Sequence, residues 1–274
     1  MKIEVDAARW SPLPDLRELA AHKDLFLTLA YRDIRVRYAQ TALGLGWAVV
    51  QPLATLVVLV LVFGKAVKVD SAGIPYPLFA MCGITAWTYF AHVMKESGSS
   101  IINSQEMVRK IYFPRLVIPL SKAAVGIIDL AVATLVLAVM FVAYRMPLGP
   151  HALVAPLAVI VMMVASVSMG IWISALTIRF RDIQHVVPFM IQFGLFITPV
   201  AYPASAVSGS LPDWGVDLYY LNPLAGPMET LRWSLFDTPI DHGRTWVSYV
   251  STAVIAVTSL LSFRALERHL ADLV

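Results

Sequence analysis

Apolar residues are concentrated in six long segments of the chain. They lie near residues 43–64, 77–95, 116–144, 152–176, 184–202 and 245–263. A bilayer core of ~30 Å is crossed by roughly 20 apolar residues in helical conformation. None of the six segments shows the two-residue alternation of a β-strand, so each is predicted to be a membrane-spanning helix. His92, Gln192 and Pro199 interrupt the second and fifth segments.

The connections between these segments predict further helices. Residues 203–244, between the fifth and sixth segments, are too apolar for a free loop, but Pro223, Gly226 and Pro227 break them too often for a span. Short re-entrant or periplasmic helices are expected there. A short cytoplasmic helix is expected at 99–111. The predicted fold is an all-α polytopic membrane protein with one domain, residues 1–274.

The first 42 residues are predicted to form a cytoplasmic arm that contains an amphipathic helix. Its apolar positions recur at helical spacing, and they are Leu16, Leu19, Ala20, Phe26, Leu27, Ala30, Ile34 and Tyr38. Charged residues, among them Arg17, Arg32 and Arg35, lie opposite. This pattern predicts a helix in the headgroup layer of the membrane. A cytosolic helix packed on protein is the alternative.

Composition and charge support a membrane protein of defined orientation. The chain is 58% hydrophobic and 14% charged, with a mean hydropathy of +0.72, which is too little charge for a soluble surface. Sixteen of the 21 Lys and Arg residues fall on one side of the predicted spans. They are Lys2, Arg9, Arg17, Lys23, Arg32, Arg35, Arg37, Lys95, Arg109, Lys110, Arg115, Lys122, Arg179, Arg181, Arg264 and Arg268. This bias places both termini in the cytoplasm.

Two ionisable residues lie within the third segment. Lys122 and Asp129 are seven residues apart, or ~10 Å along a helix, which is too far for direct pairing on one helix. Each therefore requires water or a partner elsewhere. A proton relay requires a chain of such groups, which the sequence does not show, and this argues against a proton-coupled carrier.

Small and aromatic residues mark other candidate contacts. Ser166, Gly170 and Ser174 recur every four residues and predict close packing of another helix. An aromatic group lies near the first two segments and consists of Trp47, Trp87, Tyr89 and Phe90. It indicates either an interfacial belt or a ring that lines a sugar-conducting channel.

The sequence contains no recognisable catalytic motif. It has no G-x-x-x-x-G-K-[ST] phosphate loop, no H-E-x-x-H, no paired-cysteine zinc pattern and no G-x-S-x-G. The single cysteine, Cys82, excludes an internal disulfide. We therefore expect no catalytic residue, metal site or cofactor on this chain, and nothing predicts a nucleic-acid partner.

Five strings follow one another along the chain: YRDIRVRYAQTALGLGWAVVQPL (31–53), VRKIYFPRLVIPL (108–120), IRFRDIQHVVPF (178–189), TPVAYP (198–203) and LNPLAGPMETLRW (221–233). In this order they resemble the type-2 ABC exporter permeases, and within them the polysaccharide export group of O-antigen, teichoic acid and capsule permeases. The resemblance implies a homodimer in the inner membrane, two copies of a cytoplasmic ABC ATPase that carries ATP and Mg, and a lipid-linked polysaccharide as substrate.

The resemblance also implies roles for individual residues. ATPase coupling is expected at Arg109, Lys110, Tyr112, Phe113, Pro114 and Arg115, with a smaller contact at Arg179, Arg181 and Asp182. The lipid-pyrophosphate head is expected at Arg32, Arg35, Arg37 and Tyr38. Candidates for the channel wall are Trp47, Trp87, Tyr89, Phe90 and Asp129. A secondary carrier and a membrane-embedded transferase are the alternative functions.

Overall fold

The computed structural model describes residues 16–39 and 43–267, and within these ranges it contains helices and no strand. The first fifteen residues of the predicted cytoplasmic arm, with Lys2 and Arg9, and Arg268 of the tail lie outside the described residues. The elements are α1 (Leu16–Ala21), α2 (Lys23–Ala39), α3 (Gly46–Leu59), the π-helical η1 (Val60–Ala66), α4 (Tyr76–Gly98), α5 (Ser100–Asn103), α6 (Gln105–Lys110), α7 (Val117–Ala143), the 3-10 turn η2 (Ala152–Val154), α8 (Ala155–Arg179), α9 (Ile183–Ile197), α10 (Ala204–Ser208), α11 (Asp213–Tyr220), α12 (Ala225–Phe236) and α13 (His242–Glu267).

Helices occupy all six predicted spans, but four of them are long and apolar enough to cross a membrane. These are α3 with η1, α7, η2 with α8, and α13. Helix α4 is 23 residues long and ends in charged residues, and α9 has 15 residues. The predicted fifth span, 184–202, extends beyond the end of α9, and its C-terminal bound is wrong. Helix α9 stops at Ile197 because Thr198 precedes a proline and takes an extended conformation. The count of six spans stays a prediction.

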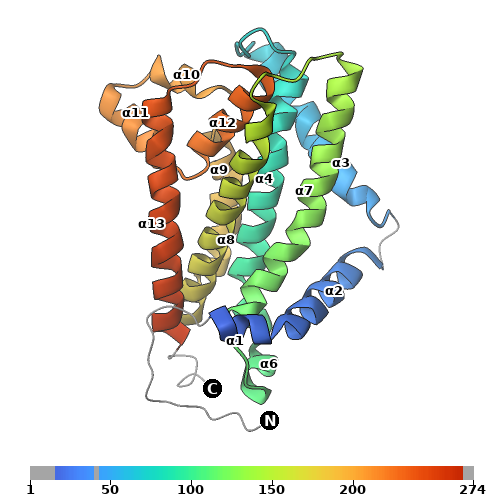
Figure 1. Ribbon diagram of the computed structural model, residues 1–274, viewed down its shortest axis with the longest axis vertical. Coiled ribbons are helices and arrows are strands. Elements are labelled where there is room, and N and C mark those ends of the chain that lie inside the picture. The colour runs from blue at the N-terminus through green and yellow to red at the C-terminus, as the bar shows by residue number, and fades with distance from the viewer. Residues whose placement is uncertain (1–15, 40–42, 268–274) are drawn as a thin grey trace.

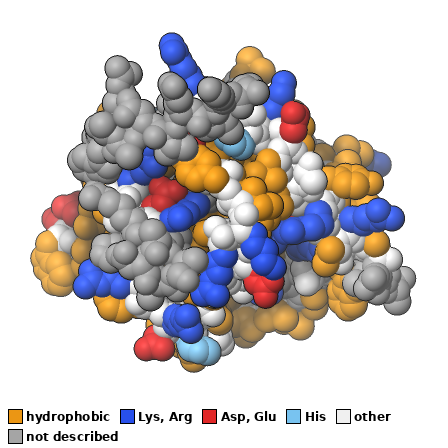
Figure 2. Space-filling view, turned by 90° about the horizontal axis from the view of Figure 1, so that it is seen from below, with side chains coloured by type: hydrophobic (Ala, Val, Ile, Leu, Met, Phe, Trp, Pro, Cys, Tyr) orange, Lys and Arg blue, Asp and Glu red, His pale blue; other side chains and the backbone are white. Residues whose placement is uncertain are grey.

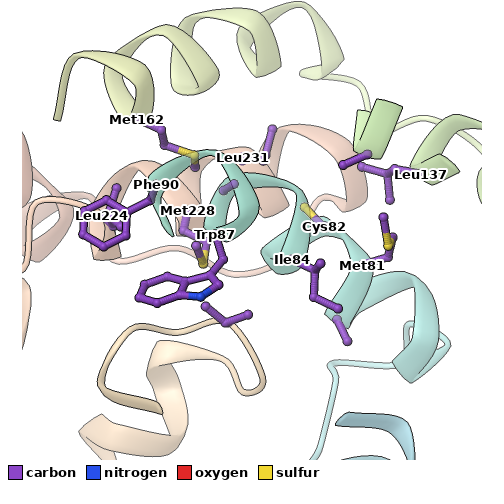
Figure 3. Packing of buried hydrophobic residues seen from close by; sticks show 14 of the residues in the cluster. Met81, Cys82, Ile84, Trp87, Phe90, Leu137, Met162, Leu224, Met228 and Leu231 are labelled. Atoms are coloured by element: carbon purple, nitrogen blue, oxygen red, sulfur yellow. The ribbon is translucent and has the colours of Figure 1, made fainter. Parts of the chain in front are cut away.

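Helix α4 lies at the centre of the molecule (Figure 1). It packs against α7 and α8, α13 runs along α8, and α12 packs on both α8 and α13. In the core, Met81 and Trp87 of α4 lie among Met162 of α8 and Met228 and Leu231 of α12 (Figure 3). Most residues of α4 are buried within the protein, which is why this helix can carry polar residues such as Thr85 and His92.

The small residues of α8 allow α4 to approach closely, as their spacing predicts. Ser166 and Ser174 are completely buried. A Cβ atom at Gly170 would lie 2.8 Å from a side-chain atom of Val93 and 3.0 Å from Ser97, both on α4. Glycine at this position therefore sets the distance between the two helices.

Short helices lie at the two ends of the bundle (Figure 1). Helices α10 and α11 form one end, and α12 lies beneath them; with 12 residues, or ~18 Å, it is too short to span. The prediction of short helices between the fifth and sixth spans is confirmed. At the opposite end, α6 projects near α1, and the helix predicted at 99–111 is divided into α5 and α6 at Ser104.

The predicted amphipathic helix corresponds to α2, which rests on α7. Leu29 and Ala30 are buried, whereas Leu27, Tyr31 and Val36 are exposed, so its apolar residues do not share one face. One side of α2 is thus packed on protein, as in the alternative raised by the sequence. A position in the headgroup layer remains a prediction.

Candidate functional site

A cavity of about 660 Å³ opens between α2, α3, α4, α7 and α9. Charged side chains come from α2, α4 and α7, and α9 contributes apolar ones. The lining residues are Asp33, Val36, Arg37, Gln51, Pro52, Thr55, Ile84, Trp87, Thr88, Ala91, His92, Lys95, Glu96, Lys122, Val125, Asp129, Ile191 and Leu195. An apolar wall with a few convergent polar groups is typical of ligand sites. This cavity is therefore the candidate site.

Asp129 on α7 is the most buried charge in the cavity wall, with 3% of its side chain exposed. Its Oδ2 atom lies 2.7 Å from Nη1 of Arg37, and its Oδ1 atom accepts a hydrogen bond of 2.9 Å from the hydroxyl of Tyr38. Both partners come from α2. A buried carboxylate is tolerated only with such partners, so α2 completes the site.

His92 of α4 connects the same groups. Its Nδ1 atom lies 2.8 Å from Nη1 of Arg37, and its Nε2 atom lies 3.2 Å from the carbonyl oxygen of Lys122. A guanidinium can only donate, so Nδ1 accepts and Nε2 carries the proton. This assignment makes His92 a neutral bridge between α2 and α7 rather than a second cation on Asp129.

A second ion pair joins α2 to α7 one helical turn away. Nζ of Lys122 lies 2.9 Å from Oδ2 of Asp33, and both side chains are mostly buried. Asp33 and Arg37 are four residues apart and share one face of α2. We call the pairs Asp33–Lys122 and Arg37–Asp129 the α2–α7 clamp. Asp33 and Arg37 are thus the partners that Lys122 and Asp129 require. The sequence feature that could have identified them is an acid four residues before an arginine on one face of a helix.

The residues proposed for a lipid head divide into two groups. Arg32 and Arg35 are exposed, and Arg32 also pairs with Asp33 at 3.0 Å. Arg37 and Tyr38 instead turn inward to Asp129. Burial and the hydrogen bond to Asp129 raise the pKa of Tyr38 to about 12, so its hydroxyl remains a donor at neutral pH. The structure therefore brings only part of the predicted group into the cavity.

The predicted channel residues also separate. Trp87 and Asp129 line the cavity. Trp47 is 44% exposed and lines an adjoining cavity of about 350 Å³, which shares Arg37 with the first. Tyr89 is buried on another face of α4, whereas Phe90 is buried beside Trp87, with the two ring centres 5.1 Å apart, and neither lines the cavity. Successive residues of a helix point in different directions, which explains why neighbours in sequence have different surroundings.

The predicted coupling segment contains an exposed part and a part packed on its own chain. Arg109, Lys110 and Tyr112 are exposed, and Tyr112 has 67% of its surface accessible. Phe113 is buried, Pro114 is half-buried, and Arg115 donates a hydrogen bond to the carbonyl oxygen at the end of α13. The second predicted contact is exposed throughout, at Arg179, Arg181 and Asp182. Lys and Arg side chains gather at this end of the molecule (Figure 2).

A buried arginine near the opposite end was not selected by the sequence analysis. Arg232 of α12 has 1% of its side chain exposed and lies 3.3 Å from Oε1 of Glu229. It donates to the carbonyl oxygens of Pro199 and Val200, and its guanidinium lies 3.8 Å from the centre of the Phe79 ring. Arg232 thereby fixes the chain break after α9 to α12 and α4. The sequence signal is an acid and a base three residues apart in an apolar segment.

Known proteins align with almost the whole chain. The sequence profile of the ABC-2 type transporter family matches residues 24–236. An O-antigen export system permease protein RfbA of Myxococcus xanthus is 26% identical over 255 residues, which cover 92% of this chain and 96% of that protein. The protein of that name in Klebsiella pneumoniae is 25% identical over 91% of this chain and 95% of its own. The polysialic acid transport protein KpsM of Escherichia coli is 23% identical over 88% and 91%.

Proposed function

Because the chain belongs to the ABC-2 type transporter family, we propose that it is the permease subunit of an ATP-driven exporter of lipid-linked cell-surface polysaccharide. The observation that carries this proposal is the alignment of nine-tenths of the chain with permeases of O-antigen export. An O-antigen-like polymer is the proposed substrate. The similarity to a polysialic acid transporter supports capsule export by the same mechanism as the second candidate.

The chain is a multi-pass membrane protein of a transport family. We place it in the inner membrane with both termini in the cytoplasm, on the basis of the asymmetric distribution of Lys and Arg. In this arrangement α4 and α9 complete six spans. Helix α4 is long enough to cross the membrane, and the turn at residues 198–202 would complete the crossing that the 15-residue α9 begins.

The energy source is expected on a partner chain. This sequence has no phosphate loop, so the proposed assembly contains two copies of the permease and two of a cytoplasmic ATPase that binds ATP and Mg, with no cofactor on the permease. A conformational change requires a ligand that binds two states differently, and ATP meets this requirement on the partner. The exposed Arg109 and Tyr112 and the turn at Arg181 are the proposed contacts.

The charged cavity is the proposed entrance for the lipid-linked substrate. Arg32 and Arg35 lie outside it and can attract an anionic pyrophosphate head. Inside, Arg37 and Lys122 are held by carboxylates of the α2–α7 clamp. Trp87 and Trp47 offer aromatic surfaces to a sugar. An ion-coupled carrier is disfavoured, because Asp129 is held by Arg37 and Tyr38 rather than open to an ion.

Deletion and reconstitution test the function. In a deletion strain of this gene, and separately of a co-encoded ATPase gene, we expect loss of the same surface polysaccharide. The purified pair in proteoliposomes should move the polymer only with ATP, and a substitution of the phosphate-loop lysine of the ATPase is the control. Uphill movement on an ion gradient by the permease alone would refute the proposal.

A further inference from the structure

A second and larger cavity, about 1170 Å³, lies on the other side of the bundle as an open groove between α7 and α8. These two spanning helices touch each other much less than each touches α4. Helices α4 and α12 close the floor of the groove. The lining residues are Thr85, Ile127, Leu130, Ala131, Thr134, Leu135, Leu137, Ala138, Phe141, Val142, Arg145, Met146, Leu148, Ala152, Ala155, Pro156, Val159, Ile160, Leu231 and Leu235.

The described residues that line the interior of the groove offer no free polar group to a ligand. Its two hydroxyl groups are already used within their own helices: Thr85 donates to the carbonyl of Met81 at 2.9 Å, and Thr134 donates to the carbonyl of Leu130 at 2.7 Å. All other lining side chains except that of Arg145 are hydrocarbon or thioether. The occupant of the interior must therefore be apolar.

The length of the groove fits a hydrocarbon chain from one leaflet. Along α7 it runs over residues 127–142, which is about 22 Å at 1.5 Å per residue. One leaflet contributes about 15 Å to a bilayer core of ~30 Å. An extended chain that enters from the end of α7 can thus remain inside the groove over the depth of its leaflet.

Among the described residues that line the groove, the only charged one lies at this end of α7. Arg145 is exposed, and within the described residues it forms no ion pair and no side-chain hydrogen bond. Its backbone is fixed, because its N–H bonds the carbonyl of Val142 at 3.1 Å and its φ is 51° in the left-handed region. A guanidinium in this position can bind the phosphate of a lipid whose chain occupies the groove.

We propose that the groove between α7 and α8 binds one phospholipid of the surrounding membrane, with an acyl chain between the two helices and its phosphate on Arg145. The lipid replaces the side-chain packing that α7 and α8 do not provide for each other. This proposal requires only that α7 and α8 span a membrane, so it does not depend on the transported substrate.

The test compares lipid retention among variants of the full-length permease, purified in detergent and observed by native mass spectrometry. The purified protein is delipidated and titrated with phosphatidylglycerol in one arm and polyprenyl phosphate in the other. Ala138→Phe fills the groove, and Ala143→Phe, on the same helix but outside the groove lining, is its matched control. Arg145→Glu is compared with Lys68→Glu, another exposed cation in a loop with positive φ.

We expect wild-type protein to retain one phosphatidylglycerol molecule, and both control variants to retain it equally. Arg145→Glu should weaken binding by about tenfold or more, as expected for the loss of a charge-assisted hydrogen bond, and Ala138→Phe should abolish it. Equal retention in Ala138→Phe and Ala143→Phe would overturn the proposal. Preferential binding of polyprenyl phosphate would also overturn it, because the site would then belong to the carrier lipid.

Discussion

Removal of Arg37 should destabilise the protein more than removal of its partner Asp129. Arg37→Met removes the ion pair of a carboxylate that is 3% exposed and leaves it with the hydroxyl of Tyr38 and, at 3.4 Å, Nδ1 of His92. Breaking a buried ion pair in this way costs about 3–5 kcal/mol. In Asp129→Asn the surviving cation is Arg37, which is 33% exposed and can be hydrated from the cavity. The cost should then be about 1–2 kcal/mol.

Thermal unfolding in detergent measures this asymmetry. At about 2–4 °C per kcal/mol for a chain of this size, Arg37→Met should lower Tm by roughly 6–20 °C and Asp129→Asn by roughly 2–8 °C. The double variant should resemble Asp129→Asn, because no unpaired carboxylate remains. Arg35→Met, an exposed arginine on the same helix, is the control and should change stability by less than about 0.5 kcal/mol.

Two results would refute this reasoning about the α2–α7 clamp. Equal loss of Tm in Arg37→Met and Asp129→Asn would mean that the carboxylate is not confined by burial. A double variant as unstable as the sum of the two single variants would mean that the side chains do not interact. Limited proteolysis within α2 provides a local measurement, and it should accelerate in Arg37→Met but not in the control.

Five other substitutions test three separate parts of the structure. Arg232→Leu should lower the free energy of unfolding by about 3–5 kcal/mol, because it leaves a buried carboxylate and two carbonyl groups without their donor. Glu229→Gln should cost less, and equal Tm values for the two variants would contradict this. Tyr112→Ala should leave Tm unchanged but reduce co-purification of the ATPase. Arg115→Glu should reduce Tm as well as co-purification, because it also breaks a hydrogen bond to α13. Unchanged recruitment of the ATPase by both variants would show that this segment is not part of the interface. Gly170→Leu should separate α4 from α8 and lower Tm by at least about 2 °C, as expected for 1 kcal/mol or more of overpacking, and an unchanged Tm would show that the contact is not tight.

The sequence by itself determined which segments are helical and which of them are apolar enough for lipid. Residues 43–64, 116–144, 152–176 and 245–263 correspond to helices that meet the requirements of a span, because length and hydropathy are local properties. The end of α9 is also set locally, by the residue before Pro199, but the predicted segment 184–202 ran past it and was wrong at this end.

Tertiary structure decided which charges meet and which faces are buried. Tyr38 and Asp129 are 91 residues apart in the chain, and periodicity contains no information about contacts at that separation. The sequence also did not separate Trp87 from Tyr89. These residues lie two positions apart, yet Trp87 lines the cavity and Tyr89 is covered by α7. In a membrane, a charge or an aromatic ring can remain inside the protein only where another helix provides its partner, so the packing of the helices determines the site.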